Sequence, residues 1–274
     1  MALLLTKVKE WCPPILLRRF KNVTSRGMKL QGKFSNWEEA LSASEGYDSP
    51  ALLDEVLTAT LKVKAGHAAY ERDSVTFTEN SYVWPTVAAI LWAMAKRGGE
   101  LSVLDYGGAL GSAYFQNKPI FGEFQNTNWS VIEQRHFVEV GRASIEDHNL
   151  KFYFTIEQCL EFESPNIALF GSVLQYIENP YQIIEDIFDC GIDLVLINRT
   201  PFSNESEDVL TVQYSNELKR SESYPSWIFS REKFLCHFSK YYSLVSEVPS
   251  PHQLSHNYQI PVTYTGFLFE RKND

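Results

Sequence analysis

Residues 101–114 read LSVLDYGGALGSAY, a short apolar run that ends in an acidic residue and enters a turn rich in glycine. Such a run is typical of a strand buried on both faces of a parallel sheet. Glycine in the turn lets the backbone bend sharply and lets a ligand lie against main-chain atoms, which a Cβ atom would obstruct. The stretch therefore predicts the first strand of an α/β core and a ligand-binding turn at Gly107, Gly108 and Gly111. A tight connection without any ligand is the alternative that the glycines alone leave open.

Further apolar runs follow along the chain, and helix-compatible stretches separate most of them. Strands that alternate with helices imply parallel βαβ units with right-handed crossovers. The connection between the last two runs has no room for a helix, which makes the last strand antiparallel. We therefore predict an α/β fold, a Rossmann-like, doubly wound, seven-stranded sheet with an antiparallel last strand. The expected strands are 101–107, 129–134, 150–155, 166–172, 193–199, 241–248 and 262–272, and the expected helices include 85–96, 180–188 and 231–238.

The segment before this core predicts an additional layer of helices. Asn36 can cap one helix, and Ser49-Pro50 can open a second that runs to Lys64. We expect residues 1–80 to form an N-terminal helical segment and residues 81–274 to form the main domain.

Two connections within the main domain are unusual. The first crossover helix, expected within 112–128, is predicted to be short or broken because Lys118-Pro119 and Gly122 interrupt it. The stretch 200–225 follows the fifth strand, is rich in Ser, Asn and Glu, and is much longer than the two to six residues usual for such connections. We expect it to be a loop that closes over an acceptor.

Charge and composition exclude several classes of protein. The formal net charge of −9 at pH 7, with no basic stripe, disfavours nucleic acid as a partner. The basic cluster within 18–33 predicts a solvated face or a weak contact with an anionic membrane surface. No apolar run approaches the ~20 residues of a membrane span, and we expect a cytoplasmic protein. The four cysteines lack a C-x-x-C pair, so we expect neither a metal site nor a disulfide framework; they are Cys12, Cys159, Cys190 and Cys236.

Two acidic residues stand at the ends of the first two expected strands. A dinucleotide site favours G-x-G-x-x-G with a neutral lead-in, whereas here Ala109 breaks the spacing and Asp105 precedes the turn. A carboxylate at this place opposes a pyrophosphate but suits the positive sulfonium and ammonium groups of S-adenosylmethionine. Glu133 can accept hydrogen bonds from both ribose hydroxyls of such a ligand. The carboxyl ends of parallel strands share one edge of a sheet, so we expect Asp105 and Glu133 to lie together; a surface glutamate is the alternative for Glu133.

With these residues in view, the sequence resembles class I methyltransferases. LDYGGALG is similar to their first motif, D-x-G-x-G-x-G, with Ala109 in place of the middle glycine, and WSVIE is similar to their second. More narrowly, FSNWEEALSASEGYD, GSVLQYIENP and INRTPF resemble a bacterial family of methyltransferases associated with surface-polysaccharide gene clusters. The narrower resemblance spans residues 34–269 and identifies no acceptor.

The resemblance implies a role for individual residues. Gly107, Gly108 and Gly111 would contact the methionine portion of S-adenosylmethionine, and Glu133 would contact the ribose. The stretch 155–157, which ends at Glu157, would lie against the adenine. Ser172 and Gln175 would line the methyl-transfer pocket, and a polar loop without a function is the alternative for both. Tyr82 and Trp84 could cap the cofactor, and aromatic packing against the core is the alternative for them.

The function that we expect is methyl transfer from S-adenosylmethionine to an oxygen of a sugar or glycan intermediate, or of another small molecule. A hydroxyl acceptor benefits from a general base, and the loop before the last strand offers His256 and His252. Solvent-exposed histidines without a role are the alternative at both positions. The other functions that the sequence leaves open are an NAD-dependent sugar oxidoreductase or epimerase, and a non-catalytic cofactor-binding scaffold.

Overall fold

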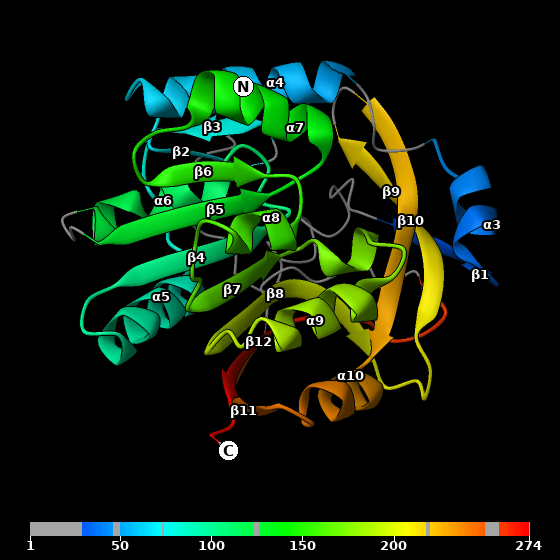
Figure 1. Ribbon diagram of the computed structural model, residues 1–274. Coiled ribbons are helices and arrows are strands. Elements are labelled where there is room, and N and C mark those ends of the chain that lie inside the picture. Colours follow the sequence, from blue (N-terminus) through cyan, green and yellow to red (C-terminus); the bar gives the residue numbers. More distant parts are fainter. Residues whose placement is uncertain are drawn as a thin grey trace, which may run out of the picture.

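A single mixed sheet forms the centre of the molecule in the computed structural model, which describes residues 29–45, 50–72, 74–122, 126–217, 220–249 and 258–273 (Figure 1). The sheet has ten strands in the order β1-β9-β10-β8-β7-β4-β5-β6, and β12 joins β8 to β11. The strands are β1 (Lys29–Phe34), β4 (Leu101–Tyr106), β5 (Thr127–Ile132), β6 (Leu150–Tyr153), β7 (Ile167–Gly171), β8 (Leu194–Ser203), β9 (Val209–Glu217), β10 (Arg220–Ser230), β11 (Tyr242–Pro249) and β12 (Thr263–Arg271).

Each apolar run singled out in the sequence forms a strand of this sheet. Strands β6, β5, β4, β7 and β8 pair in parallel. The last strand, β12, pairs antiparallel with both β8 and β11, as predicted. The predicted count of seven was too low, however, because β10, β9 and β1 extend the sheet beyond β8.

Helices cover both faces of the sheet, which explains why its strands are apolar on both sides. On β4, Val103 belongs to one buried cluster and its neighbour Leu104 to the other. The first cluster includes side chains of α4 (Pro50–Lys64), α5 (Trp84–Lys96), α6 (Ser112–Phe121) and α7 (Arg135–Val140), which continues into a π-helical turn (Gly141–Ile145). The second includes side chains of α8 (Ile156–Leu160), α9 (Pro180–Asp189) and α10 (Arg231–Phe238).

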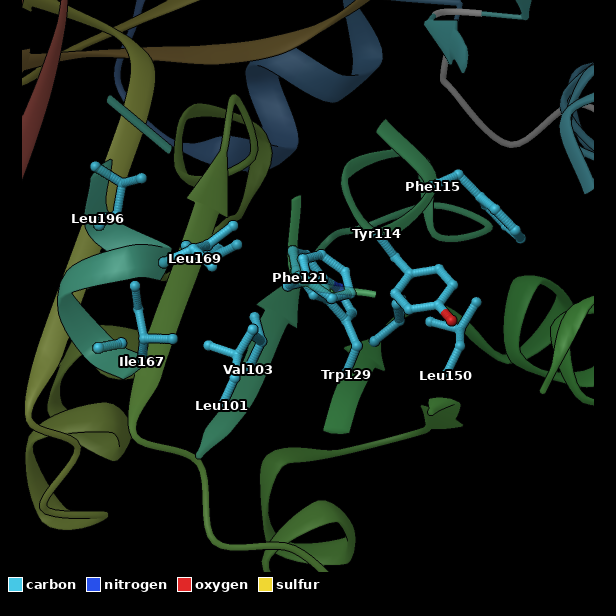
Figure 2. Packing of buried hydrophobic residues seen from close by; sticks show 14 of the residues in the cluster. Leu101, Val103, Tyr114, Phe115, Phe121, Trp129, Leu150, Ile167, Leu169 and Leu196 are labelled. Carbon is cyan, nitrogen blue, oxygen red and sulfur yellow. The ribbon is translucent and has the colours of Figure 1, made fainter. Parts of the chain in front are cut away.

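The packing of α6 on the sheet centres on one aromatic group. Trp129 of β5 is fully buried, and its ring lies 5.5 Å from that of Phe121 and 5.9 Å from that of Tyr114. Figure 2 shows these rings beside the leucine and isoleucine side chains of neighbouring strands. Burial of each such side chain contributes about 1.5–3 kcal/mol to folding. The cluster holds α6, the helix after the glycine turn, against β5, the next strand along the chain.

The helix boundaries agree with the local signals in the sequence. Asn36 caps α3 (Trp37–Ser42), and its side chain accepts a hydrogen bond from the N–H of Glu39 at 2.9 Å. Helix α4 begins at Pro50, as predicted. Helix α6 ends at Phe121 with Pro119 inside its last turn, so the first crossover helix is short. None of the helices in the described ranges combines the length and apolar character that a bilayer span requires.

One expectation about the connections was wrong. The stretch 200–225 is not a loop, because β8 continues to Ser203 and β9 and β10 form an antiparallel hairpin. Its side chains alternate, with Leu210 and Val212 packed against α3 and the polar Thr211 and Gln213 on the other face. In the described part of residues 1–80, helices α3 and α4 are accompanied by β1, β2 (Tyr70–Arg72) and β3 (Val75–Phe77).

Candidate functional site

The turn after β4 depends on glycine for both its backbone conformation and its close packing. Gly107 and Gly111 have φ values of +69° and +88°, in the left-handed region that favours glycine. A Cβ atom at Gly107 would collide with the side chain of Val173, and one at Gly111 would lie 2.9 Å from Leu150 Cδ2. Ala109 also has a positive φ, +50°, which is uncommon for a residue other than glycine. The turn is therefore held tightly against the ends of neighbouring strands.

Asp105 lies beneath this turn and is buried. A Cβ atom added at Gly108 would lie 2.6 Å from its carboxylate oxygen Oδ2. Burial raises the pKa of Asp105 to about 7, and the nearby charge of Glu133 also raises it. The Nε1–H of Trp129 opposes this shift by donating a hydrogen bond to Oδ2 at 3.0 Å. The predicted acidic residue thus lies directly beneath Gly108 of the turn.

Glu133 connects the end of β5 to the same turn. Its Oε1 accepts a hydrogen bond from the N–H of Ala109 at 3.1 Å, and its Oε2 accepts one from the N–H of Gln134 at 2.8 Å. Burial raises the pKa of Glu133, while these two hydrogen bonds lower it. An ionised carboxylate has about four lone-pair sites, so both oxygens can accept a further bond from a ligand hydroxyl. Asp105 and Glu133 are together, as their places at two strand ends predict.

A third carboxylate reaches the turn from an element that the sequence analysis overlooked. Glu71 of β2 is buried, and the hydroxyl of Ser112 donates a hydrogen bond to its Oε1. Ser112 is the first residue of α6, directly after the glycine turn. No spacing rule links a short N-terminal strand to this turn.

The segment before α5 is fixed to α6 by two hydrogen bonds. The side-chain amide of Asn80 donates to the carbonyl oxygen of Gln116 at 3.0 Å, and the Gln116 amide donates to the carbonyl oxygen of Ser81. Tyr82 follows directly and is half-buried, with its ring 5.7 Å from that of the largely exposed Trp84. Both aromatic residues singled out in the sequence therefore pack on each other.

The loop after β7 lies beside the glycine turn. Val173 of this loop is the side chain that Gly107 faces. Its neighbour Ser172 has a φ of +65° and donates its N–H to the carbonyl oxygen of Asn198 at 2.9 Å. The amide of Gln175 donates a hydrogen bond to the Ser172 hydroxyl at 3.0 Å. The two residues predicted to line the transfer pocket are thus bonded to each other next to the turn.

The predicted adenine-contacting residue lies farther along the same edge. Glu157 is exposed in the first turn of α8, whose N-cap is Thr155. A hydrogen bond with the Thr155 side chain lowers the pKa of Glu157. Burial raises the pKa of Tyr106, and the charges of Glu133 and Glu157 add to that shift, so both carboxylates lie within electrostatic reach of the end of β4.

The two histidines predicted as general bases, His252 and His256, lie outside the described residues. Within the described residues, no three His, Cys, Asp or Glu side chains gather in a way that would hold a metal ion.

Among known proteins, the chain resembles solved structures at low sequence identity. No protein-family model and no curated protein sequence matches the chain. The N-terminal domain of EvdMO1, in the presence of S-adenosylhomocysteine and D-fucose, is similar with a TM-score of 0.49 and 11% identity, covering 80% of this chain and 97% of that one.

Two methyltransferases are similar at the same low level. An amino pentose methyltransferase from Micromonospora echinaspora, with S-adenosylmethionine bound, has a TM-score of 0.43 and 9% identity, covering 70% of this chain and 92% of that one. The 1,6-didemethyltoxoflavin-N1-methyltransferase of Burkholderia thailandensis, with S-adenosylhomocysteine bound, has a TM-score of 0.40 and 13% identity. The match covers 83% of this chain and 92% of that one. The [4+2]-cyclase SpnF is similar with a TM-score of 0.46 and 12% identity, covering 80% of this chain and 94% of that one.

Proposed function

We propose that the chain is a class I methyltransferase that uses S-adenosylmethionine. The observation that carries this proposal is the set of carboxylates around the glycine turn: Asp105 beneath Gly108, Glu133 on Ala109, and Glu71 on Ser112. Negative charge at this place attracts a ligand with sulfonium and ammonium groups and repels a pyrophosphate. The proposal therefore favours S-adenosylmethionine over NAD, and an oxidoreductase or epimerase becomes the weaker reading.

Each part of the site has a role in this proposal. The main chain of the turn, at Gly107, Gly108 and Gly111, binds the methionine portion, and Glu71 attracts its ammonium group. Glu133 accepts hydrogen bonds from the ribose hydroxyls through the lone pairs that do not bind the N–H groups of Ala109 and Gln134. The adenine lies towards Glu157, and Tyr82 covers the cofactor. Ser172 and Gln175 face the acceptor.

S-Adenosylmethionine, when bound, supplies a methyl group that its sulfonium already activates. The task that remains for the chain is to orient the acceptor in line with that group and to exclude water, which supplies most of the rate in such a displacement. An acceptor hydroxyl also has to lose its proton, and His256 or His252 is the base that we propose. The acceptor in this proposal is a sugar or glycan intermediate in the cytoplasm, because the family that the sequence resembles is associated with surface-polysaccharide gene clusters.

Calorimetry with S-adenosylhomocysteine and NAD tests the cofactor directly. We expect the purified chain to bind S-adenosylhomocysteine and not NAD, and the reverse result would overturn the proposal. Incubation with labelled methyl donor and extracts of nucleotide sugars and lipid-linked glycans then tests the reaction. A chain that binds the cofactor but labels no fraction would instead be the non-catalytic scaffold.

A further inference from the structure

The hairpin β9–β10 presents a polar face to the main body of the protein. Gln213 of β9 is opposite Tyr224 of β10, and Thr211 is opposite Ser226. The hairpin joins the main sheet where β8 ends, through the pairing of Phe229 with Phe202 (Figure 1). Its polar face therefore lies at the edge where the parallel strands end. We call one group of side chains the polar interior; it combines the buried Gln175, Thr211, Gln213, Ser226 and Tyr264 with the half-buried Tyr176 and Tyr224.

Hydrogen bonds and ring contacts connect the two sides of the polar interior. The short helix η2 (Leu174–Tyr176) supplies Tyr176, whose hydroxyl donates to Gln213 Oε1 at 3.2 Å. The amide of Gln213 donates to the hydroxyl of Tyr224 at 3.1 Å. The rings of Tyr176 and Tyr224 meet edge to face, with centroids 5.0 Å apart. Two tyrosine rings and one amide thus join the hairpin to the loop after β7.

Three other polar atoms of the polar interior have no hydrogen-bond partner among the described residues. They are Gln175 Oε1, Ser226 Oγ and the hydroxyl of Tyr264, and each belongs to a side chain that is at most 3% exposed. Burial raises the pKa of Tyr264, and its neighbour Tyr176 adds to the shift. Buried polar groups are almost always paired in folded proteins, because an unpaired one loses its hydration without compensation. The three side chains come from η2, β10 and β12, and Tyr176 and Gln213 connect these segments.

The polar interior is adjacent to the site proposed for the methyl donor. Gln175 bonds to Ser172, and the next residue, Val173, packs on Gly107 of the glycine turn. A molecule that reached Gln175 would therefore lie beside the methionine end of a ligand in that turn. This is the position that an acceptor has to occupy for in-line transfer.

We propose that the polar interior is the acceptor subsite, and that it binds a neutral molecule with several hydroxyl groups through Gln175, Ser226 and Tyr264. This inference rests on the proposed methyltransferase function. The three unpaired groups are an amide oxygen and two hydroxyls, which pair well with neutral hydroxyls but leave a buried charge uncompensated. Tyrosine rings provide flat apolar faces for the C–H groups of a sugar ring. Because the three atoms are closed to solvent, the hairpin has to shift away from η2 as the acceptor enters.

Saturation-transfer NMR on the full chain with bound S-adenosylhomocysteine tests this subsite. The probes are the methyl glycosides of glucose, galactose, mannose and fucose, together with methyl glucuronide as a charged comparison. We expect at least one neutral glycoside to give a signal, and we expect Gln175→Met and Tyr264→Phe to reduce it at least about fivefold. Tyr214→Phe is the matched control, since Tyr214 lies on the opposite, apolar face of β9. Three results would overturn the inference: a signal from the glucuronide alone, the absence of a signal from every glycoside, or a signal that is unchanged in both variants.

A melting experiment without any sugar separates a binding role from a structural one. Tyr264→Phe removes a hydroxyl that has no partner, so we expect its Tm to equal or exceed that of the wild type. A fall of more than about 4 °C would show that the hydroxyl stabilises the free chain and would overturn the inference. Cofactor calorimetry distinguishes the two proposals. A wild-type chain that binds S-adenosylhomocysteine but no glycoside contradicts this inference alone, whereas one that binds no S-adenosylhomocysteine contradicts both.

Discussion

The carboxylate of Glu133 accepts a hydrogen bond from the N–H of Ala109 at 3.1 Å, and this bond joins the end of β5 to the turn after β4. The donor is the residue that replaces the middle glycine of the motif and that holds a left-handed backbone. Glu133 thus has two uses in the proposed function, because it shapes the turn and also faces the ribose. A change at this position should alter both.

Replacing Glu133 with alanine should weaken the binding of S-adenosylhomocysteine by about 1–3 kcal/mol, the usual cost of leaving polar partners unpaired. Isothermal calorimetry measures this loss. Glu139→Ala is a suitable control, since Glu139 is an exposed acid that pairs only with Arg135 among the contacts described. Equal affinity in wild type and Glu133→Ala, with the fold intact by circular dichroism, would place the ribose elsewhere.

Gly107→Val should abolish cofactor binding, because its side chain would occupy the space of Val173 and the left-handed backbone disfavours a β-branched residue. The smaller change Gly107→Ala allows a sharper test. In a Val173→Ala background, Gly107→Ala should be less harmful than in the wild type, since part of the collision is relieved. Calorimetry on the two single variants and the double variant measures this coupling. If the losses of binding free energy in the single variants simply added up in the double variant, Gly107 and Val173 would not be coupled.

The stability of the chain should depend on the ionisation of Asp105. Burial holds its pKa at about 7 in the folded chain, above the ordinary value of 3.8. The folded state therefore binds the proton more tightly, and the free energy of unfolding falls as the pH rises from about 4 to about 7. Urea unfolding at about pH 5.5 and about pH 8 should show a smaller fall for Asp105→Asn than for the wild type. The same pH dependence in both proteins would contradict this assignment.

The same ionisation should distinguish two ligands that differ by one positive charge. S-Adenosylmethionine carries a sulfonium, whereas S-adenosylhomocysteine carries a neutral thioether. As Asp105 ionises near pH 7, the affinity for S-adenosylmethionine should rise relative to that for S-adenosylhomocysteine. In Asp105→Asn the ratio of the two affinities should not change across this range. A constant ratio in the wild type would mean that the charge of Asp105 does not reach the sulfonium.

The hairpin has a buried anchor at its base that can be tested by stability alone. Asp208 precedes β9 and accepts hydrogen bonds from the N–H of Ser230 at 2.8 Å and the hydroxyl of Tyr181 at 3.2 Å. Its side chain is 8% exposed and also pairs with Lys233 at 2.8 Å. Asp208→Ala should lower the free energy of unfolding by about 1–3 kcal/mol in urea titrations. The neighbouring Glu207→Ala, which removes a largely exposed side chain, should change it by less than about 1 kcal/mol.

The sequence was informative where one local pattern determines the structure. Continuous apolar runs such as 193–199 form the central strands because helices cover both faces, and Asn36 caps its helix through a bond to a residue three positions away. The hairpin was missed because its polar residues suggested solvent, whereas Gln213 is fully buried against residues far away in the sequence. Glu71 was missed for a similar reason, since only the tertiary fold brings it to Ser112.

The strand β1 lies at one end of the ten-stranded sheet, where it pairs with β9. An outermost strand offers unpaired backbone groups to other chains and is a common starting point for aggregation. Here that strand is short, carries Lys29 and Lys33, and has an irregular register between Gln31 and Phe34. Without residues 29–34, the outer position among the described strands would pass to the longer β9, and its backbone groups would be open to pairing with another chain. We therefore expect deletion of these few residues to increase self-association.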